Sequence, residues 1–166
     1  MELSLFDITK RMNRLNVLHR IYITRAANEA GVFFGQPPIL DYVLEHAGCS
    51  QTELAEALHV SAPSIATSVK RMLKTGLLQR TRSGSDSRAN LISITDLGRS
   101  RLEECHMSFN SVNKQLFSGF SPEDLEAFNG YLIRMNANIS SDEFQDKSFF
   151  EVLSELQEQK NRKEEE

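Results

Sequence analysis

Residues 50–98 read SQTELAEALHVSAPSIATSVKRMLKTGLLQRTRSGSDSRANLISITDLG, and this stretch decides the fold. Ser50 is followed three residues later by Glu53, the spacing of a capping box, so a short helix begins here. After a tight turn, Ser61 is placed to cap a second helix, which Gly76 ends. The stretch therefore predicts two short helices that meet at a turn.

A β-hairpin is predicted directly after the second helix. Residues 77–82 and 89–94 are strand-like, and they flank the turn-forming loop Ser-Gly-Ser-Asp-Ser-Arg. Two helices followed by a hairpin predict a winged helix-turn-helix, in which the second helix reads the major groove of DNA. The predicted fold class is mainly α with a small β-hairpin (α+β).

The second helix carries two contrasting faces. Ile65, Val69, Met72 and Leu73 form one apolar stripe at helical spacing. Hydroxyls and cations follow the other side, suited to phosphate oxygens and base edges: Ser61, Ser64, Thr67, Ser68, Arg71 and Lys74. An ordinary solvated face explains this helix equally well when it is taken alone.

Arginines along the hairpin favour the DNA interpretation. Arg80, Arg82 and Arg88 suit the flanking backbone or the narrow minor groove, whose negative potential attracts guanidinium groups. Asp86 is close enough in sequence to hold Arg88 in an extended pose. A simple surface ion pair is the alternative, with a contribution well under about 1 kcal/mol.

The charge is distributed unevenly along the chain. The whole chain carries −4, but residues 61–101 contain eight basic and two acidic residues, a net +6, which leaves −10 elsewhere. A basic patch on an acidic body steers DNA toward one face.

Four motifs within this stretch resemble the multiple-antibiotic-resistance regulator (MarR) family. They are L-x-V-S at 58–61, K-R-M-L-K-T-G-L-L-Q-R at 70–80, D-S-R-A at 86–89 and I-T-D-L-G-R at 94–99. The resemblance extends more weakly over residues 7–139. It implies a homodimeric bacterial or archaeal transcriptional regulator, usually a repressor, often released by a small ligand or by oxidation.

Long helices are predicted on both sides of the core. Apolar residues recur at helical spacing over 7–30, 37–47 and 95–117, and Ser121 with Pro122 begins another helix that runs to about Ile139. We expect one domain over 1–140, with the DNA-binding core at 36–98 and dimerisation helices at 1–35 and 99–140. Packing within one chain would explain the same periodicity.

Two-fold pairing has a geometric consequence. A dimer would place two recognition helices about 34 Å apart and select an inverted-repeat operator. Residues 141–166, outside the family pattern, predict a short amphipathic helix and a disordered charged tail.

Few residues of the sequence indicate a site for a small ligand. In the family, small molecules enter the junction of the helices with the dimer seam, and the residues of this chain suited to line it are His19, Tyr22, Arg25, Phe33, Phe34 and Tyr42. Arg25 among aromatics suits a small aromatic or phenolic ligand. Core aromatics with a satisfied arginine are the commoner explanation of these residues, because apolar positions usually mean packing.

Other functional classes find less support. Cys49 precedes a helix N-terminus, which favours thiolate, although a buried inert thiol is commoner; a thiol-based redox regulator stays an alternative. A winged-helix protein-interaction module is another, but would favour an acidic or apolar face. We expect no metal, no cofactor, no enzymatic centre and no membrane span, and hence a cytoplasmic protein.

Overall fold

The computed structural model describes residues 4–33, 35–82 and 90–141, together with residues 144, 147, 151, 152 and 155. The order of elements is α1 (Leu5–Glu29), α2 (Pro37–Glu45), α3 (Gln51–Ala57), α4 (Ala62–Lys74), β1 (Leu78–Arg82), β2 (Asn90–Ile94), α5 (Asp96–Leu116) and α6 (Pro122–Ile139). This confirms the predicted mainly α architecture with one hairpin.

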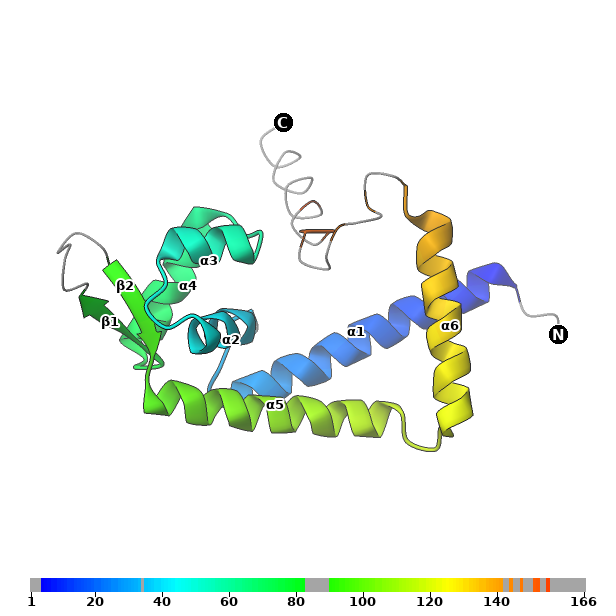
Figure 1. Cartoon of the computed structure of the whole chain (residues 1–166). Helices are drawn as coiled ribbons and strands as arrows, with labels where there is room; N and C mark the ends of the chain where they lie inside the picture. The colour runs from blue at the N-terminus through cyan, green and yellow to red at the C-terminus, as the bar shows by residue number, and fades with distance from the viewer. Residues whose placement is uncertain are drawn as a thin grey trace.

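The elements fall into two regions (Figure 1). The short helices α2, α3 and α4 gather with the hairpin near the start of α5, while α1 and α5 extend away from them as long rods that contact one another. Helix α6 lies beyond the far end of α5. The fold thus separates a compact winged helix-turn-helix from an extended helical region.

The helix-turn-helix is fixed by local signals. The Ser50 amide donates to Glu53 Oε2 over 2.7 Å, and the Glu53 amide donates to Ser50 Oγ over 3.2 Å, the predicted capping box. These bonds from Ser50 also hold the pKa of Glu53 below its ordinary value. His59, in the turn before α4, adopts a left-handed conformation with φ of 49°. The chain therefore reverses sharply between α3 and α4.

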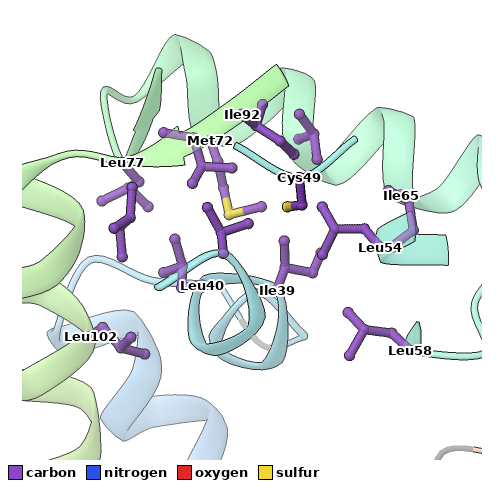
Figure 2. Close-up of a cluster of buried hydrophobic side chains, with 14 of the residues drawn as sticks. Ile39, Leu40, Cys49, Leu54, Leu58, Ile65, Met72, Leu77, Ile92 and Leu102 are labelled. Atoms are coloured by element: carbon purple, nitrogen blue, oxygen red, sulfur yellow. The ribbon is translucent and has the colours of Figure 1, made fainter. Parts of the chain in front are cut away.

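One hydrophobic core holds this region together (Figure 2). It receives side chains from α2, α3, α4 and both strands, and Leu102 from α5 joins it. Cys49 points into the same cluster, which includes the fully buried Leu54 and Met72. Burial of the apolar stripe of α4 in this core leaves its polar side facing outward.

The hairpin is paired on more than one edge. Its two strands are antiparallel, with register from Leu78 opposite Ile94 to Arg82 opposite Asn90. On the other edge of β2, the Ile92 amide donates to the Cys49 carbonyl oxygen over 2.9 Å. The hairpin is therefore anchored to the segment before α3 and cannot swing freely at its base.

A threonine and a glycine join the hairpin to α5. The Thr95 hydroxyl donates to the Gly76 carbonyl oxygen over 2.6 Å and accepts from the Gly98 amide over 3.0 Å. Gly98 packs so tightly against the Leu77 carbonyl that a Cβ there would overlap its oxygen and lie 2.7 Å from Ile94 Cγ1. This contact explains in physical terms why the motif has glycine at this position.

The long helices bury little within the chain. In α1 only Ala26 and Ala27 are buried, and α6 has no buried residue. The apolar stripe of α6 is largely uncovered in the single chain, because Leu132 is 37% and Ile139 82% exposed. Leu44 of α2 is exposed as well, since it faces away from the core that Val43 enters.

The buried apolar contact between α1 and α5 is a small cluster. Ala27, Ala30 and Cys105 are buried there, with Phe109 packed against them.

Within the described ranges, no helix is long and apolar enough to cross a membrane. The predicted amphipathic helix of the tail lies largely outside the described residues.

Candidate nucleic-acid interface

Helix α4 presents a polar face to solvent. Ser64, Thr67, Arg71 and Lys74 are exposed as predicted, whereas Ser68 is half-buried at the edge of the core. Lys70 is also exposed, and Lys74 lies between it and Thr67 on the helical wheel. We did not single out Lys70 from the sequence, although its spacing of four from Lys74 places both on one face.

Two hydroxyls at the start of α4 are hydrogen-bonded locally. Ser61 occupies the N-cap position, but its side chain makes no capping bond and instead donates to Ser64 Oγ over 2.9 Å. The predicted side-chain cap is therefore absent, which leaves the first-turn amides of α4 without a side-chain acceptor from Ser61. Thr67 donates its hydroxyl to the Pro63 carbonyl oxygen over 2.9 Å. In this conformation Thr67 can accept a hydrogen bond from DNA but not donate one.

Arg71 has a neighbour that the sequence pattern did not indicate. Its guanidinium carbon lies 5.3 Å from the centroid of the Phe33 ring, which belongs to the loop between α1 and α2. The structure therefore connects a predicted DNA-binding residue with a residue that we expected to line a ligand site.

The hairpin contributes further positive charge. Arg80 is exposed on β1, and Arg82 lies in the last position of β1, although its side chain is not among those described. Asp86 and Arg88, at the predicted wing tip, lie outside the described residues. From residue 61 to residue 82 the chain contains five basic residues and no acidic one. The outward side of α4 and the adjoining strand therefore form a positively charged surface.

The residues suggested for ligand binding have separate neighbours. His19 Nε2 lies 3.3 Å from Asn113 Oδ1 of α5, Tyr42 stacks on His46 with ring centroids 4.1 Å apart, and Phe33 lies under Arg71. Phe34 lies outside the described residues.

Arg25 and Tyr22 belong to the surface of α1. The Arg25 guanidinium carbon is 5.9 Å from the Tyr22 ring centroid. Arg25 also lines an open hollow of about 400 Å³ together with Val17, Arg20, Ile21 and Thr24.

Both thiols are in environments that favour the protonated form. Burial, with a smaller effect of Glu53, raises the pKa of Cys49, and burial with the nearby Asp41 raises the pKa of Cys105 to about 11. A raised pKa disfavours the thiolate that a redox-reactive cysteine needs. Across the ranges that the structure describes, no group of three or more His, Cys, Asp or Glu side chains could hold a metal ion.

Known proteins resemble this chain in sequence and in fold. The sequence profile of the MarR family matches residues 31–89. The HTH-type transcriptional regulator YwoH of Bacillus subtilis (strain 168) is 33% identical over 118 residues, which cover 68% of this chain and 84% of YwoH.

Solved structures also share the fold, and YusO and MepR are two of them. The YusO protein from Bacillus subtilis superposes with a TM-score of 0.70 at 20% identity, covering 82% of this chain and 96% of YusO. A substituted form of MepR from S. aureus, bound to an oligodeoxyribonucleotide, gives a TM-score of 0.63 at 19% identity, covering 84% of this chain and all of MepR. The family and its relatives are transcriptional regulators rather than enzymes. With its winged helix-turn-helix and basic recognition face, this chain belongs to the MarR family of DNA-binding transcriptional regulators.

Proposed function

We propose that this regulator is a cytoplasmic repressor that binds an inverted-repeat operator as a homodimer. The observation that carries the proposal is the outward face of α4, where Lys70, Arg71 and Lys74 are exposed in a stretch without acidic residues. Such a face neutralises phosphates and reads base edges in the major groove. A substituted form of MepR, which shares the fold, is bound to an oligodeoxyribonucleotide in its solved structure. An interaction module for proteins would not require this density of cations.

A second copy of the chain is the occupant that we propose for the apolar faces of α1 and α6. In α1, Leu15, Leu18 and Ile21 are exposed, and in α6 Leu132 and Ile133 are exposed. Burial of such side chains is favourable by about 25 cal/mol per Å² of apolar surface, so a face of this kind stabilises a dimer. Pairing through these helices would present two α4 helices to successive major grooves.

Binding to DNA is tested first with duplexes selected from a randomised library by the full-length protein. We expect an inverted-repeat consensus and a log affinity that falls linearly with log salt, with a slope of about −0.9 per phosphate neutralised. Salt-insensitive binding, or equal affinity for every duplex, would contradict the proposal. A reporter downstream of the selected operator separates repression from activation.

Two substitutions on α4 distinguish base contacts from phosphate contacts. Arg71→Ala should lose about 1–3 kcal/mol of binding free energy and relax the preference at one base pair if Arg71 contacts a guanine edge. Lys70→Ala should weaken all duplexes alike and reduce the salt slope by about 1 per protomer. If both substitutions weakened all duplexes equally, Arg71 would be a phosphate contact.

For the wing, we propose that Arg88 enters the minor groove and that Asp86 orients it. Arg88→Ala and Asp86→Ala should both weaken operator binding, and the double variant should lose less than the sum. An Asp86→Ala variant with unchanged or higher affinity would exclude the orienting role.

Release by a small aromatic or phenolic ligand is the remaining part of the proposal. Arg25 supports it, because this cation lies beside Tyr22 and lines an open hollow with apolar neighbours on α1. Salicylate and benzoate are suitable probes, and we expect them to dissociate the wild-type complex with its selected duplex but not the complex of Arg25→Ala. Equal release of both proteins would exclude Arg25 as the anchor.

A further inference from the structure

The loop between α1 and α2 holds its backbone in place with a buried glutamine. The side chain of Gln36 is only 4% exposed, and its Oε1 accepts the Phe33 amide over 2.9 Å. In return, the backbone amide of Gln36 donates to the backbone carbonyl oxygen of Phe33 over 2.9 Å. The preceding Val32 is buried, and its amide bonds the Ala27 carbonyl oxygen of α1. The backbone at Phe33 is therefore tied both to α1 and to the start of α2.

The side chain of Phe33 is left half-exposed by this arrangement and faces α4. Its ring lies 5.3 Å from the Arg71 guanidinium carbon, within the range of a cation–π contact. Among the described residues, no carboxylate or carbonyl group bonds that guanidinium. Contact with a ring face satisfies none of the N–H groups, so the donors of Arg71 stay available for a ligand.

We propose that Phe33 is a positioning residue for DNA recognition, which acts by restricting the Arg71 guanidinium to the outward side of α4. A free arginine loses the rotamer freedom of its long side chain on binding, whereas one already held against a ring whose backbone is fixed has lost part of it beforehand. The inference rests on the proposed DNA-binding role of α4. It adds a residue outside the helix-turn-helix to the recognition machinery.

Affinity measurements with the duplex selected by the wild-type protein test the proposal. Phe33→Ala and Phe33→Leu should each weaken binding by about two- to five-fold, as expected for loss of an exposed cation–π contact, while Phe33→Tyr keeps the ring and the affinity. Leucine retains apolar bulk, so it separates the ring contact from simple packing. Wild-type affinity in Phe33→Leu would overturn the proposal.

A double-mutant cycle assigns the effect to Arg71. Phe33→Leu should have no further effect in an Arg71→Ala background, whereas it should act multiplicatively with Lys74→Ala, a cation of the same helix for which no ring contact is seen among the described residues. Multiplicative losses with Arg71→Ala would overturn the proposal. Thermal unfolding of each variant checks that the fold is retained.

A measurement without DNA keeps the inference separate from the proposed function. In proton–nitrogen NMR spectra, the Arg71 Nε–H resonance should carry a ring-current shift that disappears in Phe33→Leu but persists in Phe33→Tyr. Absence of the shift would overturn the stacking itself. If the wild-type protein selected no duplex, the proposed function would fail, whereas selection with unaffected Phe33 variants would refute only this inference.

Discussion

Gly98→Ala should be among the most damaging single-methyl additions in this chain. Gly98 lies in the first turn of α5, and a Cβ there would overlap the Leu77 carbonyl oxygen and approach Ile94 Cγ1 to 2.7 Å. The Leu77 carbonyl cannot move away easily, because it accepts the Thr95 backbone amide over 3.1 Å. The clash is therefore with fixed backbone rather than with the end of a flexible side chain.

The magnitude follows from two opposing effects. Alanine is favoured over glycine within a helix by about 1 kcal/mol. Overpacking costs about 1–3 kcal/mol, and we take the upper end because the neighbour is backbone. We expect a net loss of about 2 kcal/mol, which for a chain of this size lowers Tm by about 4–8 °C.

Gly130→Ala is the matched control. Gly130 is also helical, but a Cβ there would meet no atom outside its own stretch of helix within 4 Å among the described residues. This variant should gain up to about 1 kcal/mol from helix propensity alone. Calorimetry at one protomer concentration, with sedimentation to confirm equal oligomeric states, compares the two. A Gly98→Ala protein as stable as wild type would refute the steric argument.

Three further predictions concern the cap, the thiols and the loop. Ser50→Ala should lower the free energy of unfolding by about 1 kcal/mol in denaturant titrations. The charged form of Glu53 belongs to the same cap, and its pKa is lowered in the fold. Its contribution to stability is therefore complete at pH values above the ordinary carboxyl pKa and is lost as the pH falls and the carboxylate is protonated. Since burial raises its pKa to about 11, Cys105 should resist iodoacetamide at mildly alkaline pH until the protein unfolds; rapid native labelling would revive the redox alternative. Gln36→Leu should cost about 1–3 kcal/mol by orphaning the Phe33 amide, and unchanged stability would show that water replaces Gln36.

The sequence predicted the helix-turn-helix well because its signals are local. The capping box at Ser50 and the apolar stripe of α4 depend only on residues a few positions apart, and both are present in the structure. Ser61 shows the limit of such signals. A serine at an N-cap position can bond either the helix amides or a nearby hydroxyl, and here the Ser64 hydroxyl is its partner.

The contact between Phe33 and Arg71 could not be predicted in the same way. The two residues are far apart in sequence, and their contact depends on how the loop after α1 packs against α4. Each residue has an ordinary local explanation, as an exposed aromatic and as a cation on a polar helix face. Only the packing of α2 and α4 into one core brings the loop to the recognition helix.

Periodicity also indicates that a helix has an apolar face without indicating what covers that face. Apolar residues recur at helical spacing in α1 and α6 as well as in α4, yet of these three helices the core buries only the stripe of α4. The buried end of α1 is where Ala27 and Ala30 meet Cys105, and the earlier turns have no comparable neighbour among the described residues. Small residues allow the helices to approach closely at this end, whereas the larger Leu15 and Leu18 lie beyond it and are exposed. The chain thus divides its surface by chemistry, with a basic face on α4 for a polyanion and apolar faces on α1 and α6 that a second copy would bury.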